Sequence, residues 1–183
     1  MKLFKKLMAV ALAGAMVLTL FTGCAASVNK NELLKTLNDA KAYKEGYGIE
    51  TIEAGDSTLA KNAASKAKDF IANHPDSVAE EAFYRAWNEE DDVAGIRSIV
   101  PKDTKDAYYL TFERLTKAQS EEYKAQPAAY VALHLEELIG LNKLTREQIN
   151  QLGDKATASI TTQKIGDYEY LVVVLVQAAK AAK

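Results

Sequence analysis

The sequence predicts a single α+β domain, in which helices cover both faces of a small, mainly antiparallel sheet. The predicted order is a helix, a short strand, two helices, one or two strands, two helices and a C-terminal hairpin. The hairpin turns at Ile165-Gly166-Asp167, between two strand-like arms. Its second arm, YEYLVVVLV, loses the alternation of polar and apolar residues in its later half. We therefore expect this strand to be buried on both faces, which requires helices on both sides of the sheet.

The first predicted helix begins at Asn31, a residue suited to the N-cap position. Its apolar residues recur at helical spacing: Leu33, Leu34, Leu37, Ala40 and Tyr43. Gly46 and Gly48 mark its end. The next segment, Tyr47 to Glu53, favours β structure and predicts an edge strand or an extended loop.

Two more helices follow, and the first of them begins at Asp56 or Ser57. Its predicted inner face is rich in alanine, which indicates a close approach to a neighbouring element: Leu59, Ala60, Ala63, Ala64, Ala67, Phe70 and Ile71. It ends at His74-Pro75, because a residue before proline avoids helical angles. Ser77 and Glu80 predict a capping box for the second helix. Its predicted inner face is Val78, Ala79, Ala82, Phe83, Ala86 and Trp87.

The middle of the chain contains further strand-like and helix-like segments. Residues 93–100 are a candidate strand, and residues 107–114 alternate as a half-buried strand does. One side of this second strand carries Tyr108, Leu110 and Phe112. We expect a helix over residues 116–124 and a longer helix from Pro127 to Gly140.

The last third begins with a second capping box, formed by Thr145 and Gln148. It starts a short helix whose inward residues are Ile149 and Leu152. The hairpin arms, residues 158–164 and 168–176, follow it.

The N-terminus has the pattern of a secretory signal peptide. Basic residues at positions 2, 5 and 6 precede 15 apolar or small residues, from Leu7 to Phe21. This run is shorter than the about 20 residues that a membrane span needs. The string Phe21-Thr22-Gly23-Cys24 resembles a bacterial lipobox, with Phe in place of the usual Leu, and this resemblance implies lipidation of Cys24. An ordinary signal peptidase cut before Ser27 is the alternative.

This interpretation divides the chain into four parts. Residues 1–23 are the leader, 24–30 the lipidated cysteine and its tether, 31–177 one α+β domain, and 178–183 a frayed tail. Without its 23-residue leader the 183-residue chain keeps 160 residues, too few for a two-lobed solute-binding lipoprotein. The leader holds three lysines and no acid, so the net charge changes from −2 to −5. Such a charge argues against a nucleic-acid partner.

Three strings resemble the CAP superfamily of SCP-like extracellular domains. ELLKTLNDAKAYKEGYGIETI is similar to the family's first helix, and STLAKNAASKAKDFIANHPDS is similar to its second. SITTQKIGDYEYLVVVLVQA resembles the closing hairpin. The resemblance implies an α-β-α sandwich with a cleft of two histidines and two acids, which bind a divalent metal in some members.

Two residues match that cleft. His74, in NHPDS, lies where the first family histidine would be, and Glu113, in TFERL, matches the family's Glu. The family's GHR-like string is missing. The resemblance therefore implies an incomplete tetrad, with His74 and Glu113 as candidates for catalysis and His74 as a candidate metal ligand. The alternative for His74, a histidine before proline at a helix end, is a cap on the helix carbonyls.

Other catalytic patterns are weak. His134 and Glu137 are three positions apart on a predicted helix, a spacing that can serve a metal, although a partly buried or surface histidine also fits. The sequence has no HExxH, G-x-S-x-G or S-x-x-K string. The acids of NEEDD are typical of a solvated helix end.

Aromatic residues gather in the first part of the chain. The sequence has nine tyrosines and one tryptophan. Six of these residues are a candidate binding patch: Tyr43, Tyr47, Tyr84, Trp87, Tyr108 and Tyr109. Their flat faces and polar edges suit a glycan or a peptide, and the alternative is that they border the core.

We therefore expect a non-catalytic binding or interaction domain, anchored by lipid to the extracytoplasmic face of the bacterial cell membrane. Its partners would be the membrane and an envelope glycan, peptide or protein, and it would need no cofactor. One alternative is a CAP-type hydrolase of peptide or peptidoglycan, with a divalent metal or carboxylates in its cleft. Another is an accessory lipoprotein of a membrane complex.

Overall fold

The computed structural model describes residues 30–115 and 138–181. The helices in this part are α2 (Lys30–Asp39), α3 (Lys41–Tyr47), α4 (Thr58–Asn73), α5 (Ala79–Arg85) and α8 (Arg146–Asn150). Two short 3₁₀ helices, η1 (Glu89–Asp91) and η2 (Ile96–Ile99), follow α5. The strands are β1 (Thr51–Ala54), β2 (Ala107–Leu115), β3 (Ile139–Gly140), β4 (Leu152–Ile165) and β5 (Tyr168–Ala179).

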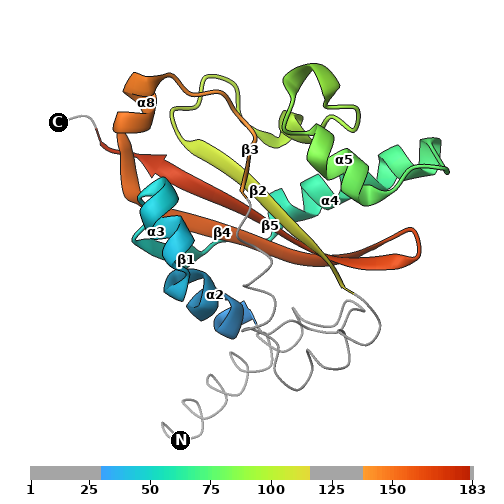
Figure 1. The fold of residues 1–183 in the computed structure, drawn as a ribbon, viewed down its shortest axis with the longest axis horizontal. Helices are drawn as coiled ribbons and strands as arrows, with labels where there is room; N and C mark the ends of the chain where they lie inside the picture. Colours follow the sequence, from blue (N-terminus) through green and yellow to red (C-terminus); the bar gives the residue numbers. More distant parts are fainter. Residues whose placement is uncertain (1–29, 116–137, 182–183) are drawn as a thin grey trace, which may run out of the picture.

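The strands form one sheet in the order β1-β4-β5-β2-β3 (Figure 1). The long pairs β4–β5 and β2–β5 are antiparallel, and only β1 runs parallel to its neighbour, β4. The β4–β5 turn has two residues, and Gly166 has the positive φ, 59°, that glycine supplies at this position of hairpin turns. The predicted α+β class with a mainly antiparallel sheet is confirmed.

Helices cover both faces of the sheet, as the pattern of β5 predicts (Figure 1). Val172 and Val174 face the core made with α4 and α5, whereas Leu171, Val173 and Leu175 face the core made with α2 and α3. All five side chains are completely buried. A central strand with two covered faces explains the loss of alternation in its sequence.

Helix α4 lies close to β4 and β5 through the predicted alanine face. Ala60, Ala63, Ala64 and Ala67 are fully buried, and the Ala60 amide donates a hydrogen bond of 2.9 Å to Ser159 Oγ on β4. The helix ends at His74, as predicted.

The predicted first helix is in fact two helices. Ala40 has an extended backbone (ψ 111°) and separates α2 from α3, and α2 begins at Lys30, so Asn31 lies inside it. Near the end of α2, the Asn38 side chain accepts from the Ile52 amide (2.7 Å) and donates to its carbonyl (2.8 Å). Asn38 thereby satisfies backbone groups on the outer edge of β1, where no other strand of the described residues pairs.

Three predictions between residues 77 and 100 are wrong. Val78 and Trp87, predicted on the inner face of α5, are 49% and 71% exposed. Val78, not Ser77, is the N-cap of α5, and the Glu80 carboxylate instead accepts a 2.6 Å hydrogen bond from the buried Tyr170 hydroxyl. Residues 93–100 contain η2 rather than a strand. The Asp92 carboxylate accepts from the backbone amides of Ile96 and Arg97, which favours a helical turn over an extended chain.

The C-terminal third is confirmed in outline and corrected at its edges. The Thr145–Gln148 capping box is present, but Ile149 is 53% exposed rather than buried. The predicted helices over 116–124 and from Pro127 lie outside the described residues, except that the last two positions of the second form β3. Strand β5 runs to Ala179, two residues beyond the predicted end of the domain.

Candidate functional site

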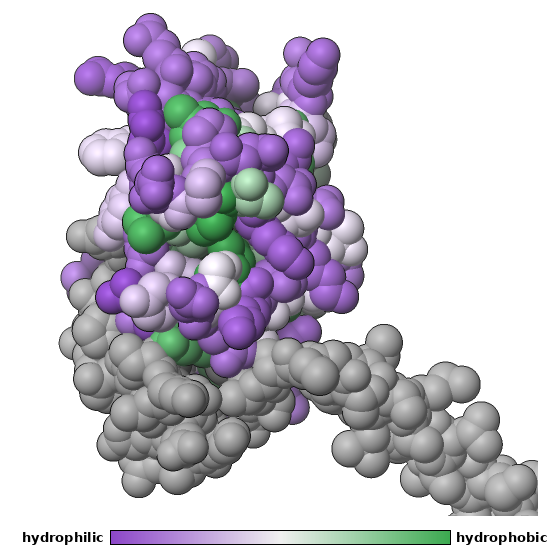
Figure 2. All heavy atoms as spheres, turned by 90° about the vertical axis from the view of Figure 1, so that its right-hand side faces the viewer, coloured by the Kyte–Doolittle hydropathy of each residue, from purple (hydrophilic) through white to green (hydrophobic). Residues whose placement is uncertain are grey.

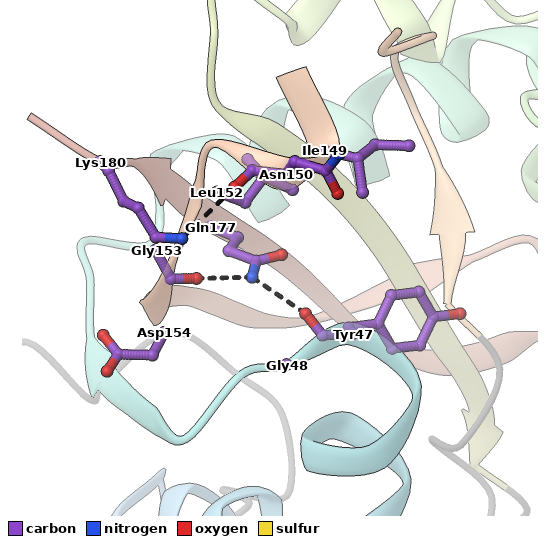
Figure 3. Close-up of a pocket in the computed structure, with 9 residues that line it drawn as sticks. All are labelled: Tyr47, Gly48, Ile149, Asn150, Leu152, Gly153, Asp154, Gln177 and Lys180. Carbon is purple, nitrogen blue, oxygen red and sulfur yellow. Dashed lines mark hydrogen bonds between the residues drawn. The ribbon is translucent and has the colours of Figure 1, made fainter. Parts of the chain in front are cut away.

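A cavity of about 470 Å³ opens at the end of the sheet where β4 begins and β5 ends (Figure 3). It lies between the C-terminal end of α3, helix α8 and these two strand ends. The lining residues are Tyr47, Gly48, Ile149, Asn150, Leu152, Gly153, Asp154, Gln177 and Lys180. The volume is in the range of small-molecule sites, about 300–1,000 Å³.

Gln177 fixes one wall of this cavity. Its side chain is only 1% exposed, and its amide nitrogen donates to the carbonyls of Tyr47 (3.0 Å) and Gly153 (2.8 Å). Its amide oxygen accepts from the Tyr109 hydroxyl at 3.1 Å. These bonds hold α3, β4 and β2 in place around the cavity. Burial, with the neighbouring Tyr47, raises the pKa of Tyr109 to about 12.

Two opposite charges lie on one side of the cavity, across from the Tyr47 ring (Figure 3). Lys180 Nζ donates to the Asn150 carbonyl at 3.3 Å, and the exposed Asp154 carboxylate lies at the start of β4. Within the described residues, neither group has an ion-pair partner within 4.0 Å. On the opposite side, Ile149 is 53% exposed and provides an apolar contact surface.

The structure does not bring His74 and Glu113 together. His74 is at the end of α4, where its ring stacks on Phe70 (4.6 Å) and its Nδ1 lies 3.0 Å from the Phe70 carbonyl. Because a carbonyl only accepts, this bond places a proton on Nδ1. Glu113 and Leu115 are two residues apart on β2, so their side chains point to the same face of the sheet, the one that packs on α2 and α3. Helix α4 covers the opposite face. His74 therefore caps its own helix and shares no pocket with Glu113.

Three candidate residues lie outside the described residues: Cys24, His134 and Glu137. Within residues 30–115 and 138–181, no three His, Cys, Asp or Glu side chains gather in an arrangement that could hold a metal ion.

The six aromatic residues of the candidate patch do not form one surface. Tyr43 and Tyr108 are buried, on opposite faces of the sheet. Tyr47 contacts Tyr109 edge-to-face at 5.1 Å behind the cavity. Only Tyr84 and Trp87, on the side of α5, are highly exposed, at 54% and 71%.

Tyr84 and Trp87 are two of four strongly exposed hydrophobic side chains on and next to α5. We call Val78, Tyr84, Trp87 and Val93 the α5 surface, since each is at least 43% exposed. Figure 2 views this end of the molecule and shows apolar side chains surrounded by hydrophilic ones. The Tyr84 ring packs edge-to-face on Phe112 at 5.4 Å, which orients it.

Arg97 fixes the backbone that carries Trp87. One of its guanidinium nitrogens donates to the carbonyls of Ala86 and Trp87, both at 3.1 Å, and the other pairs with Glu89 at 3.1 Å. The Arg97 side chain is only 10% exposed. Trp87 therefore projects into solvent from a backbone held by a nearly buried arginine.

Sequence analysis did not predict the cavity, because its lining residues are distant from one another in the chain and form no recognisable motif. Lys180 falls in the predicted tail, and Asp154 falls between the predicted short helix and the predicted hairpin. One signal did exist, since Gln177 is a single amide directly after the apolar run of β5. A polar residue at the end of a strand buried on both faces needs hydrogen-bond partners.

Comparison of the chain with protein-family models, curated proteins and solved structures finds no match in any of the three. The resemblances to the lipobox and to the CAP superfamily therefore stay predictions. In the part of the chain that the structure describes, none of the helices has the length and apolar composition needed to cross a membrane.

Proposed function

We propose that this protein is a non-catalytic interaction domain, held by a lipid on Cys24 at the extracytoplasmic face of the bacterial cell membrane. Its α5 surface would bind a polypeptide partner. The observation that carries this proposal is the exposure of Trp87, 71%, on a backbone held by Arg97. Rigidly presented tryptophan and tyrosine side chains are the residues that most often dominate protein interfaces.

One exposed carboxylate near Trp87, that of Glu90, favours a basic group on the partner. Between residues 80 and 92 the sequence has six carboxylates and one arginine. Four of these acids are in ion pairs: Glu80 with Arg114, Glu81 and Asp91 with Arg85, and Glu89 with Arg97 and Lys143. Glu90 lies exposed three residues from Trp87. An arginine or lysine of the partner could stack on Trp87 and approach this carboxylate.

The intrinsic fluorescence of the protein tests this proposal directly, because Trp87 is the only tryptophan in the chain. We expect a peptide of alternating leucine and arginine to shift the emission of the detergent-solubilised full chain, and added salt to weaken the effect. Tyr84→Ala should weaken binding about tenfold, the size typical of an interface hot spot. Ile149→Ala, an equally exposed apolar site elsewhere, should leave it unchanged.

An N-acetylglucosamine oligomer is the competing probe in the same assay. A response to this oligomer and none to the peptide would replace the polypeptide partner with a glycan. An accessory lipoprotein of a membrane complex would use the same α5 surface for a protein partner. The hydrolase alternative has no comparable support, because His74 and Glu113 lie on opposite faces of the sheet.

A further inference from the structure

The cavity beside Gln177 is separate from the α5 surface. Its helix, α8, and helix α5 lie toward opposite ends of the molecule (Figure 1). None of the cavity-lining residues belongs to the α5 surface.

We propose that this cavity binds a small zwitterion with an apolar side chain, of the α-amino acid class. Lys180 would receive the carboxylate of the ligand, and Asp154 would receive its ammonium group. Ile149 and Leu152 would contact the apolar side chain.

The opposite charges of Lys180 and Asp154 favour a zwitterion over a ligand with a single charge. An anion attracted to Lys180 would be repelled by the Asp154 carboxylate on the same side of the cavity (Figure 3). A cation attracted to Asp154 would likewise be repelled by the Lys180 ammonium group. A ligand that carries both charges avoids both penalties. Because no described side chain neutralises either charge in an ion pair, both remain available to such a ligand.

The apolar part of the cavity would contact the apolar side chain of the ligand. Ile149 is a large aliphatic residue on a short helix, yet 53% of it is exposed beside the cavity. Leu152 and the ring of Tyr47 continue this lining. The cavity wall is built before any ligand arrives, since the Gln177 amide already ties the Tyr47 and Gly153 carbonyls together.

Glycine amides provide the readout, because Gly48 and Gly153 line the cavity while Gly166 lies at the far turn of the hairpin. The detergent-solubilised full chain, labelled with ¹⁵N-glycine, would be titrated with L-leucine. We expect the Gly48 and Gly153 resonances to shift and the Gly166 resonance to stay in place. L-Leucinamide lacks the carboxylate and N-acetyl-L-leucine lacks the ammonium group, so each should bind about two- to fivefold more weakly.

Two substitutions test the assignment of each charge. Asp154→Asn should weaken leucine binding about two- to fivefold and strengthen binding of the anion N-acetyl-leucine, which Asp154 no longer repels. Lys180→Gln should weaken leucine binding to the same extent and strengthen binding of the cation leucinamide. The matched controls Asp167→Asn and Lys164→Gln, near the far turn, should change nothing. Absence of a shift with leucine, or binding of N-acetyl-leucine as tight as that of leucine, would overturn the proposal. Loss of peptide binding at the α5 surface would leave this result untouched.

Discussion

The amide of Gln177 shows how one buried polar side chain can join three segments that are distant in the sequence. It contacts α3, the start of β4 and strand β2 through hydrogen bonds of 2.8–3.1 Å. Its partners are the Tyr47 and Gly153 carbonyls and the Tyr109 hydroxyl. Without Gln177, each of these groups would lack a replacement for the hydrogen bond to water that it loses on burial. Such a group costs about 1–3 kcal/mol when left without a partner.

We therefore predict that Gln177→Leu lowers the free energy of unfolding by about 2–4 kcal/mol, because the Tyr47 and Gly153 carbonyls and the Tyr109 hydroxyl lose their partner. Urea denaturation followed by circular dichroism measures the change. Gln163→Leu is the control, since the Gln163 amide bonds only the carbonyl of its neighbour, Lys164. It should stay within about 0.5 kcal/mol of the wild type, and equal losses in both variants would refute the role of Gln177.

The raised pKa of Tyr109 leads us to predict a loss of stability at alkaline pH. Burial raises its pKa from 10 to about 12 in the folded protein. The folded state therefore keeps a proton that the unfolded chain releases, so stability is present below pH 10 and falls as the pH rises toward 12.

Urea midpoints measured between pH 9 and 11.5 should fall less steeply in Tyr109→Phe than in the wild type. Tyr84→Phe is the control, because the Tyr84 side chain is 54% exposed. Equal slopes in the two variants would show that Tyr109 does not carry the effect.

At the level of secondary-structure elements, a side chain of α2 provides hydrogen bonds to the backbone of β1 at the edge of the sheet. Asn38 on α2 bonds both the amide and the carbonyl of Ile52, as a neighbouring strand would. This arrangement blocks edge pairing with another chain at that point. It also links α2 to the sheet.

Asn38→Ala should lower the free energy of unfolding by about 1–3 kcal/mol, because the amide and carbonyl of Ile52 lose their partner. Asn73→Ala is a close control, because Asn73 also lies on a helix and its side chain donates to the carbonyl four residues earlier, that of Asp69, within its own helix. Thermal or urea unfolding compares the two variants. A similar loss in both would mean that the contact with β1 contributes little.

Local sequence rules worked for elements whose partners are close in the chain. The Thr145–Gln148 capping box formed as predicted, because both of its hydrogen bonds are local. The Ser77–Glu80 box did not form, because Glu80 bonds Tyr170 and pairs with Arg114 on two distant strands. The charged hydrogen bond to a buried hydroxyl outcompetes a solvent-exposed cap.

At the scale of the whole molecule, the proposed lipid on Cys24 limits where the domain can lie. Seven residues, 24–30, would connect the lipid to the start of α2. Fully extended, they span at most about 25 Å. We therefore expect the domain to stay close to the membrane surface, with the cavity and the α5 surface toward opposite ends of the molecule.

Intact-mass measurement of the membrane-extracted protein should show a chain that begins at Cys24 and carries acyl groups. Cys24→Ser should move the protein from the membrane fraction to the soluble fraction, because several acyl chains on one residue anchor stably. Ser27→Ala is the control and should remain membrane-bound. A soluble wild-type product that begins at Ser27 would show ordinary signal-peptide cleavage instead.

Local sequence patterns were enough to predict the α+β class, the alanine face of α4, the end of that helix at His74, and the hairpin with a strand buried on both faces. These features depend on periodicity and on contacts within a few residues, so the local pattern carries them. Only the tertiary structure decided that His74 and Glu113 lie on opposite faces, that Trp87 is exposed, and that Gln177 and Lys180 meet α8 and α3 at a cavity. These arrangements depend on which strands become neighbours, and the free energy of that pairing is shared among residues far apart in the chain.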